Sequence, residues 1–292
     1  MAKAFSVLSW NVEHFGAKDR RTKKPKKPIQ PIVDLIAAQK ADVVALYEVK
    51  SNVVFRHLVE TMPDHRFFIT EGPQVQEILI GVHKNLQTFA TQKSEFKESQ
   101  DKLRPGMMLT PYVDGEYYPL LFLHVKSMPD PKGFGLRAAM TQRALAFRDT
   151  LDKAAGGKAN YIFMGDFMGD MNTMGMKYGD VRRANRRNPR RSVRDVDDVI
   201  AGEREIEELR TDAGFVDMTL LEKTYENTYW SKSIGESNLD HVVAANHLAF
   251  KRFSGKPIRV SGWTDEATKA ARTAWAKAYS DHALLYFEVQ KV

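Results

Sequence analysis

The sequence contains no cysteine among its 292 residues. This absence excludes disulfide bonds, thiolate zinc sites and thiol nucleophiles together. No apolar run approaches the roughly 18 residues that a membrane-spanning helix needs. The apolar stretch within residues 1–10 is interrupted by serine and is too short for the core of a signal peptide. Such a composition is typical of a soluble, cytoplasmic protein.

What the chain does contain is ordinary for a globular protein: 43% of its residues are hydrophobic and 28% are charged. A chain of this length can bury one large core or two modest ones, so disorder is excluded as its main state. The 18 glycines and 12 prolines are too few for a fibrous or low-complexity protein. Because we find no internal repeat and no Ser/Gly-rich linker, we predict one domain over residues 1–292.

Short apolar segments rich in β-forming residues recur along the chain, and several have the continuous apolar pattern of strands buried on both faces. They are Phe5–Trp10, Asp42–Tyr47, Arg66–Thr70, Glu77–His83, Leu120–Val125, Tyr161–Met164, Leu239–Ala245 and Leu284–Val289. Helical patterns lie between them at Pro28–Lys40, Ser51–Thr61, Gly135–Lys153, Val196–Asp212 and Asp265–Lys277. This alternation, together with hairpin-like neighbours, predicts a layered α/β fold.

The net charge of +7 is concentrated in two segments. Residues 18–27 contain seven basic residues and one acidic residue, and residues 182–194 contain seven arginines and no acidic residue. These 23 residues carry +13, so the other 269 carry −6. One such run is usually a solvated loop. Two runs make a polyanion-binding surface credible if the fold brings them together.

Polar residues that suit metal binding and proton transfer are predicted to cluster at the C-terminal ends of these strands, with one segment preceding the last strand. These residues are Asn11, Glu48, His124, Asp166, Asp240 and the segment Ser280–His282. In layered α/β proteins, sites form where strand ends converge. Carboxylates and an amide without thiols suit a hard cation such as Mg²⁺ or Mn²⁺, and histidines beside carboxylates suit proton transfer or charge stabilisation.

The motifs around these residues resemble those of the endonuclease/exonuclease/phosphatase superfamily, whose fold is that of DNase I. The quoted segments are Ser9–Val12, Leu46–Glu48, Leu121–His124, a Gly-Asp-x-Asn segment, Leu239–His241 and Ser280–His282. They occur in family order from residue 9 to residue 282, so the resemblance covers nearly the whole chain. It implies a four-layered sandwich of two packed mixed β-sheets flanked by helices, a divalent cation, and hydrolysis of phosphoester bonds.

The resemblance also implies roles for individual residues. Glu48 is similar to the metal-ligand glutamate, Asn11 to the amide beside the metal and the phosphate, and Asp281 to a further metal-site carboxylate. His282 and Asp240 resemble the His–Asp dyad that either activates the attacking water or holds the phosphate. His124 matches the second histidine of the DNase I-type branch. Glu77 is a candidate for orienting it from the neighbouring strand, but we favour the interpretation of Glu77 as a strand-end residue that faces water.

The Gly-Asp-x-Asn motif occurs in two overlapping copies. The first, Gly165–Met168, directly follows an apolar strand but ends in methionine, whereas the second, Gly169–Asn172, is complete. Residues four apart on a regular strand lie roughly 13 Å apart, so Asp166 and Asp170 cannot share one metal site unless the strand is irregular. We favour Asp170 with Asn172 slightly. Asp166, with Asn172 reaching back toward it, is nearly as good an interpretation.

Charge placement favours a nuclease that acts on DNA rather than RNA with little base readout, because both basic segments follow strands that carry motif residues. The candidate phosphate contacts are Lys23, Lys24, Arg182, Arg183, Arg186, Arg187, Arg190 and Arg191. One alternative is a phosphatase or phospholipase that acts on lipid head groups, with the basic loops on an anionic surface. Another is a degenerate, non-enzymatic module that binds nucleic acid, which only Met168 supports.

Overall fold

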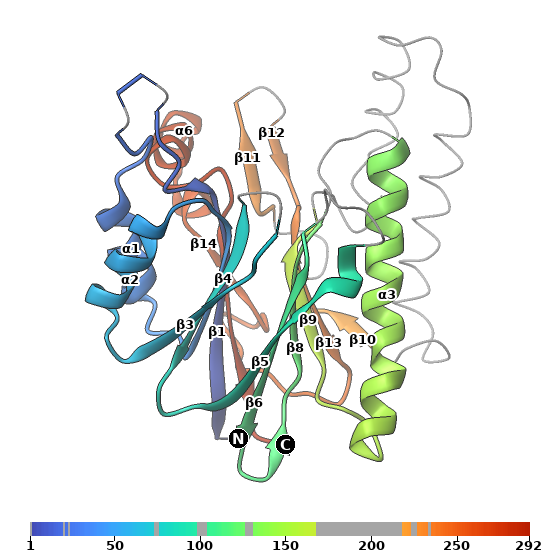
Figure 1. Cartoon of the computed structure of the whole chain (residues 1–292). Helices are drawn as coiled ribbons and strands as arrows, with labels where there is room; N and C mark the ends of the chain where they lie inside the picture. The colour runs from blue at the N-terminus through green and yellow to red at the C-terminus, as the bar shows by residue number, and fades with distance from the viewer. Residues whose placement is uncertain are drawn as a thin grey trace.

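The computed structural model describes residues 2–19, 21–22, 24–72, 76–97, 104–125, 131–167, 218–222, 227–232 and 235–292. Within these residues the chain forms two mixed β-sheets that face each other, with helices on their outer faces (Figure 1). This is the predicted α/β sandwich. No helix among the described residues is long and apolar enough to cross a membrane.

The first sheet has the strand order β14-β15-β1-β2-β4-β3. Its strands are β1 (Lys3–Phe15), β2 (Val43–Val49), β3 (His65–Ile69), β4 (Glu77–His83), β14 (Arg259–Ser261) and β15 (Leu284–Gln290). Strands β1 and β2 run parallel, whereas β15 lies antiparallel to β1 on its other side. The start of β15 therefore lies at the same edge of the sheet as the ends of β1 and β2.

The second sheet has the order β10-β13-β9-β8-β6-β5, with β7 paired to β6. Its strands are β5 (Gln87–Lys93), β6 (Gly106–Val113), β7 (Glu116–Tyr117), β8 (Leu120–His124), β9 (Ile162–Asp166), β10 (Met218–Leu220) and β13 (Asp240–Ala245). Strands β8 and β9 run parallel and β13 lies antiparallel to β9. A separate hairpin joins β11 (Tyr229–Ser231) to β12 (Gly235–Ser237).

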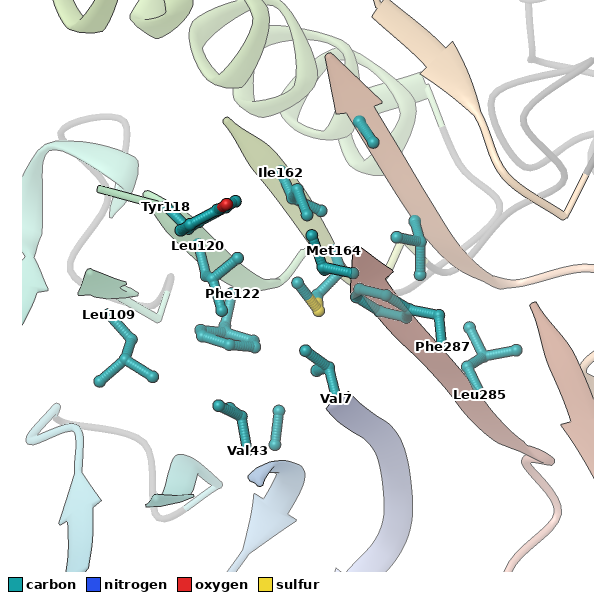
Figure 2. Packing of buried hydrophobic residues seen from close by; sticks show 14 of the residues in the cluster. Val7, Val43, Leu109, Tyr118, Leu120, Phe122, Ile162, Met164, Leu285 and Phe287 are labelled. Carbon is teal, nitrogen blue, oxygen red and sulfur yellow. The ribbon is translucent and has the colours of Figure 1, made fainter. Parts of the chain in front are cut away.

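The main core lies between the two sheets. Val7 and Val43 of the first sheet belong to the same buried cluster as Leu120, Phe122 and Met164 of the second (Figure 2). Alternate residues of these strands face outward into two further clusters. Burial on both faces explains why their sequences are continuously apolar.

Helices cover the outer faces of both sheets. The first sheet is covered by α1 (Ile29–Ala38) and α2 (Asn52–Thr61), and residues of α6 (Lys269–Ala278) pack against the same cluster. The second sheet is covered by α3 (Pro131–Ala155). Helix α2 begins as predicted, because the Ser51 side chain accepts a hydrogen bond from the Val53 amide at 3.2 Å. The single-turn elements η1 (Ser94–Lys97) and η2 (Trp263–Asp265) complete the described helices.

Several strands were not predicted from the sequence. Strand β5 is polar and largely exposed at a sheet edge, and β6 contains Gly106 and Pro111. Strands β10, β11, β12 and β14 have three residues each, and β7 has two. Such short or polar strands lack the periodicity that marks a strand in sequence. The predicted helix Val196–Asp212 lies outside the described residues.

Candidate active site

Asn11 and Glu48 lie in irregular parts of two neighbouring strands, not just beyond the strand ends as the sequence suggested. The pairing of β1 with β2 shifts between Asn11 and Phe15, and that of β2 with β4 shifts between Leu46 and Val49. Glu48 itself has a φ of +64°, in the left-handed region that a glutamate seldom adopts. A bulge of this kind re-aims a side chain relative to a regular strand, and here it accompanies the two motif residues.

His124 and Asp166 end the parallel strands β8 and β9 and pair directly in register. Gly165 is what allows the two strands to approach here. Its φ is +149°, and a Cβ on it would lie 1.8 Å from the carbonyl oxygen of Leu123. Asp166 follows at once and is fully buried.

Asp240 and His282 reach the same edge from the opposite direction. Asp240 is the first residue of β13, which is antiparallel to β9, and His282 precedes β15. The prediction of carboxyl strand ends is therefore wrong for Asp240, which begins its strand. An antiparallel strand presents its beginning where its parallel-running neighbours present their ends.

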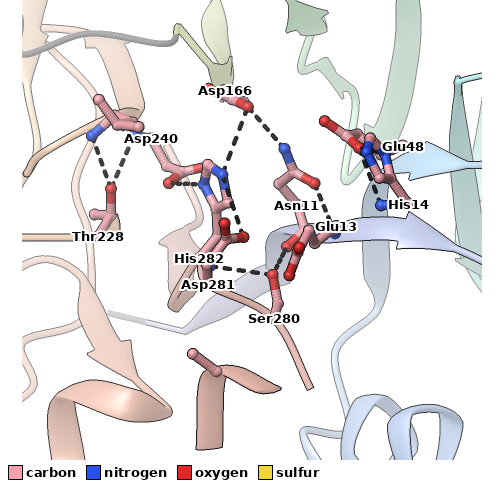
Figure 3. A network of polar contacts seen from close by, with 12 residues as sticks. Asn11, Glu13, His14, Glu48, Asp166, Thr228, Asp240, Ser280, Asp281 and His282 are labelled. Atoms are coloured by element: carbon pink, nitrogen blue, oxygen red, sulfur yellow. Dashed lines mark hydrogen bonds and ion pairs between the residues drawn. The ribbon is translucent and has the colours of Figure 1, made fainter. Parts of the chain in front are cut away.

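Asn11, Asp166, Asp240 and His282 form one connected polar cluster (Figure 3), and His124 lies beside it. Asn11 Nδ2 donates to Asp166 Oδ2 at 2.7 Å. His124 Nε2 lies 3.6 Å and His282 Nε2 lies 3.9 Å from that same oxygen. On its other side, His282 Nδ1 lies 2.8 Å from Asp240 Oδ2. The structure thus brings together residues that are up to 271 positions apart in the chain.

Glu48 and Asp281 lie at the margins of this cluster. Glu48 Oε1 is 3.7 Å from His124 Nε2, and Glu48 Oε2 accepts a hydrogen bond from the His14 amide at 3.0 Å. Asp281 Oδ1 lies 3.9 Å from His282 Nε2 and is buried without a hydrogen-bond partner among the described residues.

At neutral pH one of the two histidines is charged and the other is neutral. Burial alone would lower the pKa of His282, but the carboxylates of Asp240 and Asp166 outweigh it and raise that pKa to about 10. Burial lowers the pKa of His124 well below its usual value, and the positive charges of Arg104 and His282 add to this effect. His282 is therefore an imidazolium and His124 a neutral imidazole.

The carboxylates of the site fall into two groups, which differ in whether a protein cation already lies beside them. Asp166, Asp240 and His282 lie close enough to hold an ion, since one ligand atom from each falls within 4.8 Å of the others. However, the positive charge of His282 already balances the nearby carboxylates of Asp166 and Asp240. An imidazolium also has no free lone pair with which to bind a metal ion. Burial, together with the charges of Glu13 and Glu48, raises the pKa of Asp281 to about 6. Asp281 and Glu48, together with the Asn11 amide oxygen, are oxygen donors that could hold a divalent cation.

Three residues near Glu48 were not predicted from the sequence: His14, Gln76 and Arg104. Gln76 Nε2 donates to Glu48 Oε2 at 3.2 Å and lies 2.9 Å from His14 Nδ1, which itself contacts Glu48. The guanidinium of Arg104 donates to the Gln76 side-chain oxygen. Arg104 and Gln76 precede β6 and β4, and no motif surrounds them. Only their position just before strands that begin at this edge could have drawn attention to them.

Some predicted site residues do not join the cluster or lie outside the described residues. Glu77 has no hydrogen bond or ion pair with His124 among the described residues, and the prediction that it faces water is wrong. It is buried and accepts a hydrogen bond from Thr70 Oγ1 at 2.6 Å. Lys24 is exposed in the loop after β1. The residues outside the described part are Lys23, Met168, Asp170, Asn172, Arg182, Arg183, Arg186, Arg187, Arg190 and Arg191.

Comparisons with known proteins agree with this architecture. The sequence model of the Endonuclease/Exonuclease/phosphatase family matches residues 8–282. No curated protein sequence matches the chain. Among solved structures, a humanized TDP2 from D. rerio is 14% identical with a TM-score of 0.60, covering 98% of this chain and 99% of that one.

Two further structures show the same fold. A truncated TDP2 from Caenorhabditis elegans is 13% identical with a TM-score of 0.62, covering 98% of this chain and 97% of that one. The mannosyl-6-phosphatase Bt3783 from Bacteroides thetaiotaomicron is 13% identical with a TM-score of 0.56, covering 98% and 99% respectively. At such identities the likeness concerns the fold alone.

Proposed function

Because the chain belongs to the Endonuclease/Exonuclease/phosphatase family, we propose that it is a divalent-metal-dependent phosphodiesterase of nucleic-acid backbones, DNA in preference to RNA. One observation carries this proposal. The buried carboxylate of Asp166 is bound by the Asn11 amide and lies within 4 Å of one neutral and one cationic histidine, beside Glu48 and Asp281. Acid, base and cation-binding groups are thereby assembled around one point.

The charge states assign complementary tasks to the residues. Cationic His282, fixed by Asp240, can donate its Nε2 proton to a phosphate oxygen, where negative charge develops during displacement. Asp166 is the carboxylate placed to align a water molecule and take its proton. Neutral His124 and the Asn11 amide supply further hydrogen bonds to the phosphate. We therefore propose Asp166 as the catalytic carboxylate.

Glu48, Asp281 and Asn11 would hold the Mg²⁺ or Mn²⁺ ion. Bound there, a divalent cation supplies charge neutralisation at the phosphate and at the leaving oxygen. Asp281 supports this assignment, because its buried oxygen has no hydrogen-bond donor among the described residues.

The surroundings of Glu48 favour a substrate with more than one phosphate. The guanidinium of Arg104 is partly buried, and burial lowers its pKa although the carboxylates of Glu48, Asp166 and Glu77 act against this. Burial and the nearby positive charges of Arg104 and Lys26 lower the pKa of Lys50, despite the opposing effect of Glu48. Arg104, Lys50 and Lys26 therefore lie close enough to repel one another even with the nearby carboxylates, and a polyanion would offset this repulsion. A D. rerio TDP2 structure, 14% identical, contains a single-strand DNA product, which is consistent with such a substrate for this fold.

The test is hydrolysis of plasmid DNA, single-stranded DNA, RNA, inositol phospholipid and a chromogenic phosphodiester, each with Mg²⁺, Mn²⁺ or EDTA. We expect DNA cleavage with either ion and none with EDTA. Glu48→Gln should lower the rate at least about a hundredfold, whereas Glu60→Gln on the exposed face of α2 should not. Cleavage of the lipid alone would favour the head-group alternative. Undiminished DNA cleavage after thorough chelation would refute the metal dependence.

A further inference from the structure

Lys27 belongs by sequence to the basic segment 18–27, but its side chain is directed into the protein. The side chain is 17% exposed and its ammonium binds the carboxylate of Glu13. It also donates to the backbone oxygens of Tyr279 at 2.9 Å and Ala276 at 3.4 Å, at the C-terminal end of α6. A cation is stabilised at that end by the helix dipole and the free carbonyl groups. Lys27 therefore links the end of β1 to the end of α6.

This link closes a ring of hydrogen bonds. The Glu13 amide donates to Asn11 Oδ1 at 2.9 Å, and the Glu13 carboxylate binds Lys27. Lys27 donates to the oxygen of Tyr279, and the next residue, Ser280, donates from Oγ to the backbone oxygen of Asn11 at 2.6 Å. Two parts of the chain almost 270 residues apart are thus fixed to each other through Lys27.

Two members of the ring, Asn11 and Ser280, contact the cluster around Asp166 or the segment that carries His282. With its Oδ1 held by the Glu13 amide, Asn11 directs its Nδ2 toward Asp166. Ser280 Oγ also accepts from the His282 amide at 3.1 Å, which fixes the segment that carries Asp281 and His282 (Figure 3). Glu13 has a φ of +39°, and such a conformation persists only where surrounding contacts hold it.

We propose that Lys27 is a positioning residue of the phosphodiesterase site, which holds Asn11 and the Asp281–His282 segment at their working separation. The inference rests on the proposed function, because positioning matters only if the cluster is catalytic. It assigns to Lys27 a task different from that of the exposed lysines 24 and 26 in the same segment. Misplacing reacting groups by about 1 Å can cost about a hundredfold in rate.

The test compares Lys27→Met, Lys27→Arg and Lys277→Met on a chromogenic phosphodiester that spans a single phosphate. Lys277 lies in the last turn of α6 and is exposed, so its variant removes a charge from the same region without opening the ring. We expect Lys27→Met to lower kcat about ten- to a hundredfold with KM changed less than about threefold. Lys27→Arg should restore most of kcat, and Lys277→Met should leave it unchanged.

Amide hydrogen exchange provides a readout that does not depend on activity. Lys27→Met should speed exchange at Glu13 and at residues 280–282, while the core strand β9 stays protected. If Lys27→Met fails to fold, the double variant Glu13→Gln/Lys27→Met removes the unpaired carboxylate and should fold with the same low kcat.

The outcomes separate the two proposals. An unchanged kcat in Lys27→Met, or a flatter salt dependence of DNA binding with normal turnover, overturns the positioning role and leaves the proposed function intact. A wild-type protein inactive on every substrate refutes the proposed function and with it a catalytic positioning role. Faster exchange in Lys27→Met would then identify the ring as a structural link alone.

Discussion

His124 and His282 lie within 4 Å of the same Asp166 oxygen, yet only one of them is charged. The difference comes from their second neighbours. Asp240 sits 2.8 Å behind His282, whereas His124 Nδ1 is buried without a hydrogen-bond partner among the described residues. A carboxylate behind an imidazole favours its cation, and burial without one favours the neutral form. The same residue type is thus a cationic proton donor at position 282 and a neutral imidazole at position 124.

The imidazole of His282 should titrate near pH 10 in the metal-free protein, as measured by NMR of its ring carbons. In Asp240→Asn the pKa of His282 should fall by at least one unit, because the carboxylate that raises this pKa most is lost. A raised folded-state pKa stabilises the protein fully below the unfolded value of about 6.5. That stabilisation is lost as pH rises through about 10. Titration of His282 near pH 6.5 in the wild type would contradict the assigned charge.

Substitution of the two candidate aspartates should give unequal effects. Asp166→Asn keeps the shape of a side chain that is fully buried beside Asn11, His124 and His282, and should lower hydrolysis by at least about a hundredfold. If Asp166 is the catalytic carboxylate, Asp170→Asn should cost far less. Rates on the chromogenic phosphodiester, with Tm as the control for folding, decide between them. The reverse order would move the catalytic carboxylate to Asp170.

At the scale of elements, the site depends on how closely two parallel strands approach. Strands β8 and β9 place His124 and Asp166 directly opposite each other only because residue 165 has no side chain. The same approach lets the Val125 amide donate to the Asp166 backbone oxygen at 3.0 Å. A glycine in a strand marks such a close backbone contact.

Gly165→Ala should therefore destabilise the protein by at least about 3 kcal/mol, because the new Cβ overlaps the Leu123 carbonyl oxygen. Gly157→Ala is the matched control, since a Cβ at residue 157 meets no atom within 4 Å. Urea unfolding of both variants gives the free-energy change. A loss below about 1 kcal/mol in Gly165→Ala would mean that the two strands can separate without cost.

At the scale of the whole molecule, positive and negative charge are distributed unevenly along the chain. The chain outside the two basic segments carries −6, whereas Lys50 lies near enough to Arg104, Lys26 and Glu48 for their charges to shift its pKa. Under the proposed function, these cations would attract a polyanionic substrate toward the site. The second basic segment, residues 182–194, lies outside the described residues, and its contribution stays a prediction.

Replacing Arg186, Arg187, Arg190 and Arg191 with alanine should weaken binding of long duplex DNA. Each lost phosphate contact should flatten the slope of log affinity against log salt by roughly 0.9, through lost counterion release. Sequence preference and turnover of the chromogenic phosphodiester should not change. Lys84→Ala, at the opposite end of β4 from the site, should leave the slope unaltered. An unchanged slope in the arginine variant would exclude these residues from the DNA contact.

The sequence by itself determined most of the strands that form the two-sheet core, although not β6, whose Met107 and Leu109 also belong to it. Segments such as Leu120–Val125 and Tyr161–Met164 are continuously apolar because both of their faces are buried, and this property is local to each strand. The identities of the motif residues were equally local, so Asn11, Glu48, Asp240 and His282 could be singled out before any contact was known. The concentration of positive charge in two segments also follows from composition alone.

Only the tertiary structure decided how those residues act on one another. The strand irregularities at Asn11 and Glu48, the proton on His282 and the inward position of Lys27 each depend on a contact with a distant part of the chain. Arg104 and Gln76 join the site only through such contacts. Hydrogen bonding, burial and Coulomb interaction depend on distances in space, and a linear pattern does not contain those distances.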